Sequence, residues 1–187
     1  MPSTLRTFIG VRIPCPPKLL PVLSNLRRLG DALRTAAPDD LHLTFKFLGD
    51  TPVDQVGDIA GQLEAAADGR GPLSGRLRGL GAFPGPARPR VIWVGVEFSE
   101  ELPRLARELD DRLAPWGFAT EGRTYHPHVT LARVQGRPPR ELAAILQASA
   151  EVDFGPADIR EIELFQSEPG PSGSRYTSLA RFEFRGE

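Results

Sequence analysis

Hydrophobic residues recur along the chain in two rhythms, which predict a mixture of strands and helices. Runs of alternating apolar and polar residues, or of β-branched and aromatic residues, are typical of strands and occur at 6–13, 42–48, 74–83, 91–98, 126–134, 159–166 and 176–184. Apolar residues spaced by three and four form one face of a helix and occur at 18–33, 53–67, 99–114 and 140–150. Residues 168–174, with two glycines and two prolines, are expected to form a surface loop.

The order of these elements repeats about halfway along the chain. When the first strand is aligned with the strand at 91–98, Gly10 lies 32 residues before His42, and Gly95 lies 33 residues before His128. A glycine and then a helix follow each histidine-bearing strand. The spacing therefore indicates two copies of one β-α-β-α-β-β unit.

This repeat predicts the architecture. The two related units, at about 5–90 and 91–185, would form a single bilobal domain over 1–187. Because strands follow one another directly at the end of each unit, we expect an α+β fold of mostly antiparallel sheet rather than a doubly wound parallel fold. The lobes would be related by a pseudo-twofold axis, with helices on their outer faces and a catalytic cleft between them.

Charge and composition narrow the classes of function. The 187 residues carry 23 basic and 24 acidic side chains, a net charge of -1, so broad capture of duplex nucleic acid by a basic face is not expected, although a local arginine cluster could hold one phosphate. No run approaches the roughly 20 apolar residues of a membrane helix, and no secretion signal is evident. We expect a cytoplasmic protein with no membrane association. Cys15 is the only cysteine, which excludes an internal disulfide.

The three histidines of the chain all lie at the starts of the two equivalent strands. Because residues i and i+2 share a face of a strand, His42 lies beside Thr44, and His128 lies beside Thr130. If the units pack as pseudo-twofold partners, these two His–Thr pairs face each other across the cleft.

Two opposed imidazoles suit in-line displacement at phosphorus. Histidine, with an ordinary pKa of about 6.5, can take a proton from the attacking oxygen on one side and give one to the leaving oxygen on the other. The threonine hydroxyls would bind the non-bridging oxygens, and Arg133 would add a fixed cation. Arg133 lies five residues after His128, so it can share the face of the histidine only if the strand ends or bulges near that point.

A zinc site is the alternative chemistry for the same residues. His126 and His128 are two apart on one strand face, a spacing that can chelate zinc, and His42 could supply the third ligand of a catalytic site. His126 has no counterpart in the first unit, where Asp40 occupies the equivalent position. We therefore expect neither a metal nor another cofactor.

The sequences around the two histidines resemble a known family. Two motifs of the form His-x-Thr-apolar lie 86 residues apart, within the segments Leu41-His-Leu-Thr-Phe-Lys-Phe-Leu-Gly49 and His126-Pro-His-Val-Thr-Leu-Ala-Arg133. They resemble the paired motifs of the two-histidine (2H) phosphoesterase superfamily, and in particular its RNA 2′,3′-cyclic phosphodiesterase branch, also called the 2′-5′ RNA ligases. One such motif is a weak signal, but two in this register are specific, and the resemblance covers essentially the whole chain.

The resemblance implies metal-free opening of the terminal 2′,3′-cyclic phosphate of RNA to a 2′-phosphomonoester, with reversible 2′-5′ ligation as a further activity. It makes His42 the general acid and His128 the general base, two roles that the sequence alone allows to be exchanged. Thr44 and Thr130 would hold phosphate oxygens, and the arginine of the family falls on Arg133. The implied partners are RNA 3′ ends, among them tRNA halves, and we expect a monomer.

Other residues and other functions are open at this point. His126 and Tyr125 are expected to line the cleft, and Phe165 could stack on a base, although aromatic residues that end strands more often belong to the core. One alternative function is a non-catalytic module that binds RNA ends, for which binding would survive replacement of the histidines. Another is a phosphodiesterase that acts on a small cyclic nucleotide or a 2′-5′ oligonucleotide.

Overall fold

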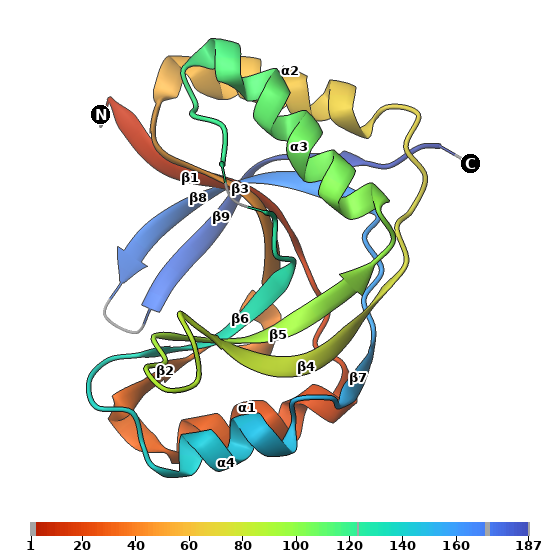
Figure 1. The fold of residues 1–187 in the computed structure, drawn as a ribbon. Helices are drawn as coiled ribbons and strands as arrows, with labels where there is room; N and C mark the ends of the chain where they lie inside the picture. Colours follow the sequence, from red (N-terminus) through yellow and green to blue (C-terminus); the bar gives the residue numbers. More distant parts are fainter. Residues whose placement is uncertain (1–2, 123, 171–172, 187) are drawn as a thin grey trace.

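The computed structural model of the chain describes residues 3–122, 124–170 and 173–186 (Figure 1). Its strands are β1 (Thr4–Arg12), β2 (Leu33–Thr35), β3 (His42–Pro52), β4 (Gly75–Phe83), β5 (Val91–Phe98), β6 (His128–Val134), β7 (Asp153–Pro156), β8 (Glu161–Gly170) and β9 (Gly173–Glu183). Its helices are α1 (Leu20–Arg28), α2 (Val56–Ala67), α3 (Glu101–Leu113) and α4 (Glu141–Ala148). None of the described helices is long and apolar enough to cross a membrane.

Antiparallel pairs join the strands in the order β7-β4-β5-β6-β3-β1-β8-β9, with β2 also beside β6. This arrangement confirms the predicted α+β fold of mostly antiparallel sheet. Between β3 and β6 the ladder consists of one residue pair, Leu43 with Val129. We therefore distinguish the β1 sheet (β3, β1, β8, β9) from the β5 sheet (β7, β4, β5, β6, β2), which meet at this narrow joint.

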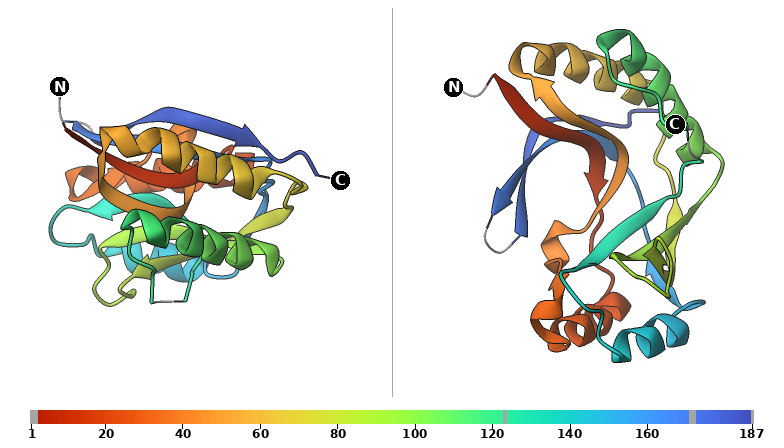
Figure 2. Two further views of the ribbon diagram at one scale, coloured as in Figure 1. Left: turned by 90° about the horizontal axis from the view of Figure 1, so that it is seen from above. Right: turned by 60° about the vertical axis from the view of Figure 1, so that its left-hand side comes forward.

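The helices lie in two pairs at opposite ends of the molecule. In Figures 1 and 2, α2 and α3 lie together beside the β1 sheet, and α1 and α4 lie together beside the β5 sheet. Each helix packs through an apolar stripe; in α3 the stripe is the buried set Leu102, Leu105, Leu109 and Leu113.

The two sheets exchange strands between the halves of the chain. Strand β4, from the first half, pairs with β5, whereas β8 and β9, from the second half, join β1. The order β3-β1-β8-β9 in one sheet matches β6-β5-β4-β7 in the other, with β1 equivalent to β5 and β3 equivalent to β6. A duplicated unit would produce this symmetry, and the duplication over 5–90 and 91–185 stays a prediction.

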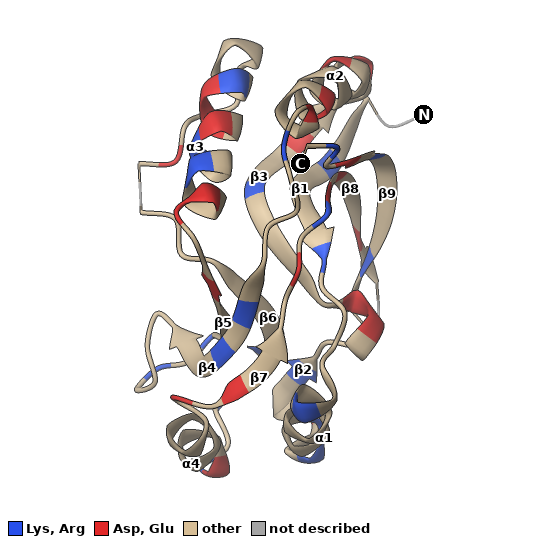
Figure 3. Ribbon diagram, turned by 90° about the vertical axis from the view of Figure 1, so that its right-hand side faces the viewer, with Lys and Arg blue, Asp and Glu red and all other residues tan. Residues whose placement is uncertain are grey.

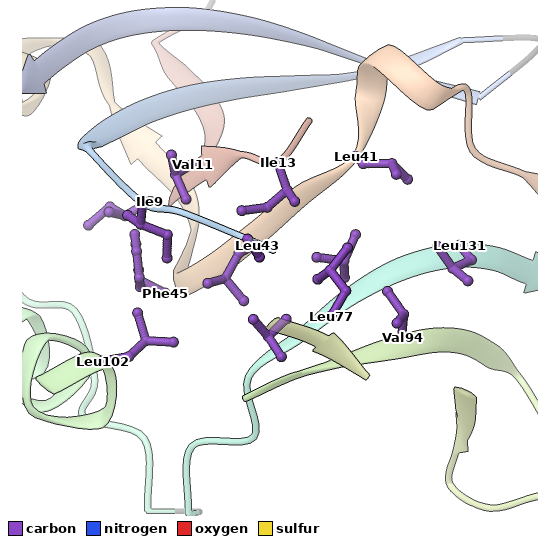
Figure 4. Close-up of a cluster of buried hydrophobic side chains, with 14 of the residues drawn as sticks. Ile9, Val11, Ile13, Leu41, Leu43, Phe45, Leu77, Val94, Leu102 and Leu131 are labelled. Atoms are coloured by element: carbon purple, nitrogen blue, oxygen red, sulfur yellow. The ribbon is translucent and has the colours of Figure 1, made fainter. Parts of the chain in front are cut away.

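Alternate residues of the central strands enter one hydrophobic core. Figure 4 shows side chains from both sheets converging there. Those exposed by 2% or less include Ile9, Val11, Leu43, Val94, Val129 and Leu131. Because successive side chains of a strand point to opposite faces, the histidines and threonines that precede and follow Leu43 and Val129 lie on the face away from this core.

The predicted helix at 18–33 is wrong in its C-terminal part. Helix α1 ends at Arg28, and Gly30 adopts a positive φ of 79° that interrupts regular helix. Leu33 then begins β2 and is buried against the β5 sheet instead of extending the helical stripe.

Strand boundaries also differ from the sequence prediction. The strand expected from residue 126 begins at His128, because Pro127 has no N–H to contribute to a ladder. Most of the loop expected at 168–174 is paired, since β8 runs to Gly170 and β9 begins at Gly173; residues 171–172 lie outside the described residues. The short strand β7 is not predicted from the sequence at all.

Candidate active site

Two histidines and two threonines lie together at the joint between the sheets. Continuing the antiparallel register from the single pair that joins β3 to β6 places His42 opposite Thr130 and Thr44 opposite His128. All four side chains are half-buried, on the face away from the core. Opposite Cβ atoms in such a register are about 5 Å apart and diagonal ones about 7–8 Å. The two histidines therefore occupy opposite corners of a small group.

The same kind of hydrogen bond holds both imidazole rings. Nδ1 of His42 lies 2.8 Å from the backbone carbonyl of Asp40, and Nδ1 of His128 lies 2.7 Å from that of His126. A carbonyl oxygen can only accept, so Nδ1 carries a proton in each ring. Nε2 is then the nitrogen of each histidine that remains to exchange a proton with a ligand.

The surroundings of both rings favour neutral imidazole. Burial lowers the pKa of His42 and of His128 below the ordinary 6.5, and the backbone hydrogen bonds oppose this effect. The positive charge of Arg133 lowers both pKa values further, and Arg12 also lowers that of His42. Arg133 thus contributes to both shifts, and it lines the same cavity as His42 and Thr130.

A β-bulge explains how Arg133 reaches this face. The pairing between β5 and β6 skips Leu131, since Thr130 and Ala132 pair with consecutive residues of β5. An extra residue reverses the alternation of the strand beyond it. Leu131 and Ala132 are accordingly both buried, and Arg133 is exposed on the side of the histidines. Arg133, five residues after His128, needed a bulge in order to share the face of the histidine, and that bulge is present.

Strand β3 has the equivalent bulge, three residues after its own histidine. Thr44 and Lys46 pair with consecutive residues of β1, which leaves Phe45 as the extra residue. Phe45 and Lys46 are both buried, and the next residue, Phe47, turns to the same face as His42. Phe47 is thus the counterpart of Arg133 in the other sheet.

Phe47 is an exposed aromatic residue beside the histidine of the β1 sheet. Its side chain is 60% exposed, and its ring centroid lies 5.9 Å from that of Phe8. Strict alternation along β3 places Phe47 on the core face, so the strand pattern does not reveal it. Its equivalence to Arg133 in the repeat is the one sequence signal that could have identified it.

Aromatic side chains flank both histidines, although sequence patterns single out none of the four. Their ring centroids lie at the following distances: Phe8 (5.1 Å) and Tyr176 (4.6 Å) from His42, and Phe83 (4.9 Å) and Trp93 (6.2 Å) from His128. Such contacts restrict the rotation of each imidazole and shield one side of it from water. The two rings are therefore held in similar apolar settings.

Of the other predicted cleft residues, His126 is exposed and Tyr125 is part-buried. His126 lies at the edge of the aromatic group around His128, and its ring centroid is 6.3 Å from that of Phe83. The Tyr125 hydroxyl donates a hydrogen bond of 2.9 Å to the backbone carbonyl of Thr44, and burial raises the pKa of Tyr125. Tyr125 therefore connects the segment before β6 to the middle of β3.

The suggestion that Phe165 stacks on a base is wrong. Phe165 is 1% exposed and stacks on Phe8, with ring centroids 5.0 Å apart. The guanidinium of Arg12 lies over its ring, 5.4 Å from the centroid. The ring is thus covered, and it supports the aromatic residues next to His42.

A cavity of about 340 Å³ adjoins this group and is lined by His42, Thr130 and Arg133 among others. Its wall continues through α1, β2 and the start of β9. A larger hollow of about 620 Å³, between α2 and the end of β9, contains none of the predicted site residues. One histidine, one threonine and the arginine of the predicted site therefore line the smaller cavity, whereas Thr44 and His128 are not part of its lining.

The zinc alternative requires a cluster of ligand side chains. Within 3–122, 124–170 and 173–186, no group of three or more His, Cys, Asp or Glu side chains is arranged to hold a metal ion. His42, His126 and His128 do not form such a group. What the residues offer is proton transfer from two Nε2 atoms beside a shared arginine.

Comparison with known proteins identifies the family and fold that this chain resembles. Residues 15–171 match the model of the 2′-5′ RNA ligase superfamily. The chain is 34% identical over 164 residues to an RNA 2′,3′-cyclic phosphodiesterase of Aeropyrum pernix, covering 87% of this chain and 92% of that one. It is 32% identical over 181 residues to a protein of the same name from Archaeoglobus fulgidus, covering 96% and 100%. The crystal structure of TT0787 of Thermus thermophilus superimposes with a TM-score of 0.79 at 28% identity, covering 98% and 100% of the two chains.

Proposed function

The chain belongs to the 2′-5′ RNA ligase superfamily, and we propose that it hydrolyses the 2′,3′-cyclic phosphate at the 3′ end of RNA to a 2′-phosphomonoester. Two relatives named RNA 2′,3′-cyclic phosphodiesterase, 34% and 32% identical over most of the chain, support this reaction. The observation that carries the proposal is the pair of histidines at the joint, each with Nδ1 bound to a backbone carbonyl.

In the proposed reaction, water attacks phosphorus opposite the 3′ oxygen. Nε2 of His128 takes a proton from the water as the new P–O bond forms. The bond between phosphorus and the 3′ oxygen breaks, and Nε2–H of His42 protonates the departing oxygen. The phosphate stays on the 2′ oxygen, and one proton has moved onto His128 and one off His42. Exchange of the two roles leaves this balance unchanged.

The remaining site residues bind the phosphate. The hydroxyls of Thr44 and Thr130 donate hydrogen bonds to the non-bridging oxygens, which gain charge in the transition state. Arg133, brought to this face by the bulge in β6, supplies a guanidinium to the same oxygens. Each sheet thus contributes one histidine and one threonine, and the β5 sheet contributes the cation.

The same geometry supports 2′-5′ ligation. If the 5′-hydroxyl of a second RNA strand takes the place of water, His128 removes its proton, and the product is a 2′-5′ phosphodiester. Microscopic reversibility makes cleavage of that linkage the reverse reaction through the same two histidines. RNA 3′ ends with a cyclic phosphate are therefore the proposed partners in both directions.

The test is hydrolysis by protein that has been dialysed against a chelator. RNA that ends in a 2′,3′-cyclic phosphate is incubated with the protein, and the product is compared with authentic 2′- and 3′-phosphates. We expect the 2′-phosphate alone. Replacing His42 or His128 by alanine is expected to reduce kcat by at least about 10²-fold, the usual contribution of one general acid or base.

His126→Ala is the matched control, because His126 is the remaining histidine and is exposed at the edge of the site. The kcat of this variant is expected to fall by less than about tenfold, because His126 takes no part in the proposed proton transfer. Near-normal turnover after replacement of either proposed catalytic histidine would refute the mechanism. RNA binding without turnover by the wild-type protein would instead identify a binding module.

A further inference from the structure

We propose that the active site includes a second phosphate subsite, formed by Arg27 and Arg34, which binds the phosphodiester on the 5′ side of the terminal nucleotide. Both arginines line the same cavity as His42 and Arg133. This inference rests on the proposed function, because it assigns the part of the RNA that lies beyond the reacting phosphate.

The position of Arg34 is the first observation. In the pairing of β2 with β6, Arg34 lies directly opposite Arg133, and both side chains are exposed. Like charges at opposite positions of a strand pair destabilise a sheet. An anionic ligand removes that repulsion, so two adjacent guanidiniums indicate that negative charge is bound between or beside them.

The balance of charge around the cavity is the second observation. Three arginines line it, Arg27, Arg34 and Arg133, against a single carboxylate, Asp40. Among the residues that the structure describes, no carboxylate oxygen lies within 4.0 Å of these three guanidiniums, whereas Asp40 is 4.0 Å from Arg12. Figure 3 shows basic segments on α1 and β2, which lie side by side at this end of the molecule.

Local hydrogen bonding provides a third observation. Nη2 of Arg27 donates to the backbone carbonyl of Ala36 at 3.0 Å, which fixes one edge of the guanidinium and leaves its other N–H groups available. The guanidinium of Arg27 is thereby held at the wall of the cavity, with donors free to bind an anion.

The topology places this subsite next to the proposed reaction centre. Strands β2 and β3 follow the same edge of β6, so Arg34 lies beside Arg133, and Arg133 affects both histidines. A phosphodiester one nucleotide upstream of the cyclic phosphate is the nearest other anion on an RNA 3′ end. Contacts to phosphate carry no base information, so the preferred substrate class is an RNA chain of any sequence instead of a mononucleoside cyclic phosphate.

The test uses adenosine 2′,3′-cyclic phosphate with and without a 5′-phosphate, which represents the upstream phosphodiester in its smallest form. In the wild-type protein, the 5′-phosphate is expected to raise kcat/KM by about tenfold or more, the effect of one or two charge-assisted hydrogen bonds. In Arg34→Gln and in Arg27→Gln, we expect the ratio of the two kcat/KM values to fall to within about twofold of one. Arg28→Gln, an exposed neighbour on α1 that does not line the cavity, is the control and should keep the wild-type ratio.

Binding of adenosine 2′-phosphate and adenosine 2′,5′-bisphosphate, measured by calorimetry, gives the same comparison without turnover. The bisphosphate is expected to bind about tenfold more tightly to the wild-type protein and to lose that advantage in Arg34→Gln. Equal affinity for both ligands, or an advantage that persists in the arginine variants, would refute the subsite. Failure of the wild-type protein to hydrolyse RNA that ends in a 2′,3′-cyclic phosphate, with the binding difference intact, would refute the proposed function and support the subsite.

Discussion

At the scale of single residues, each histidine is controlled by groups outside its own motif. The carbonyls of Asp40 and His126 fix the protonated nitrogen, and the aromatic neighbours of each ring provide the burial that lowers its pKa. The motif His-x-Thr predicts which residues react, but the positions of these groups come from strand pairing. The proposed proton transfer therefore depends on both the motif and its surroundings.

The lowered pKa values predict the pH dependence of the reaction. One imidazole must be neutral and the other charged, so kcat/KM should be bell-shaped. Because both pKa values are lowered in the free protein, the maximum should lie below pH 6.5. The anionic substrate favours imidazolium, so the kcat profile should lie at higher pH than that of kcat/KM. Hydrolysis rates measured from pH 4 to 9 test this, and a monotonic profile would contradict it.

The same measurement in Arg133→Gln isolates the effect of this arginine on the two histidines. Its positive charge lowers the pKa of both histidines, so its loss should raise both values and move the kcat/KM maximum to higher pH. The loss of a donor to the phosphate should also reduce kcat by about 10²-fold. Arg140→Gln, an exposed position on the loop before α4, should leave the profile unchanged. A rate loss without a shift in pH would mean that Arg133 binds phosphate but does not act on the histidines.

Phe47 supports a prediction about substrate binding. An exposed aromatic ring beside the proposed site for RNA ends can stack on any base, a contact that contributes about 1–3 kcal/mol in single-strand binding. Phe47→Ala should therefore raise KM by about tenfold with little change in kcat, and Phe47→Tyr should restore it. Leu20→Ala replaces another exposed apolar residue, 46% exposed on α1, and is the control that should keep the wild-type KM. An unchanged KM in Phe47→Ala would exclude the stacking contact.

At the scale of strands and helices, equivalent bulges in β3 and β6 place Phe47 and Arg133 on the face of the histidines. The residues of each motif are visible in the sequence, but a bulge depends on register with a neighbouring strand. For the same reason, the sequence does not reveal β7, or β2 inside the apolar stripe of the predicted helix. Most strands, the helix positions and both His–Thr pairs could be predicted because they depend on local periodicity and spacing.

Gly10 tests how closely β1 must approach β3. A Cβ atom at Gly10 would overlap the carbonyl oxygen of Leu43, next to His42. Gly10→Ala should therefore reduce the free energy of unfolding by about 2 kcal/mol, as overpacking does, and should also lower kcat. Gly61→Ala, in the interior of α2 with open space around it, should be neutral or stabilising by up to about 1 kcal/mol. Chemical denaturation measures both, and equal stabilities for the two variants would contradict the close approach.

At the scale of the whole molecule, an ion pair connects the two halves of the chain. Lys46, on β3, is 2% exposed and pairs with Asp110 on α3, and its Nζ also donates to the carbonyl of Ala119 at 2.7 Å. Asp110 accepts a further hydrogen bond from the backbone N–H of Glu121 at 3.1 Å. The inward bulge at Phe45 and Lys46 thus anchors α3 and the segment after it to the β1 sheet.

Replacing this lysine should destabilise the fold. Lys46→Met leaves Asp110 without its counter-charge, and removing one partner of a buried pair costs about 3–5 kcal/mol; we expect the lower end, since the Asp110 side chain is 18% exposed. Lys18→Met, at the only other lysine and on the surface, should change the free energy of unfolding by less than about 0.5 kcal/mol. Denaturant titration compares the two, and a small effect at Lys46 would show that water reaches the pair.

The exchange of strands between the sheets determines how partial unfolding affects activity. Since β4 completes the sheet of the second histidine and β8 completes the sheet of the first, neither half of the chain contains an intact support for its own imidazole. Partial denaturation cannot leave a half-working centre behind. Turnover is then an all-or-none reporter of the integrity of the entire polypeptide.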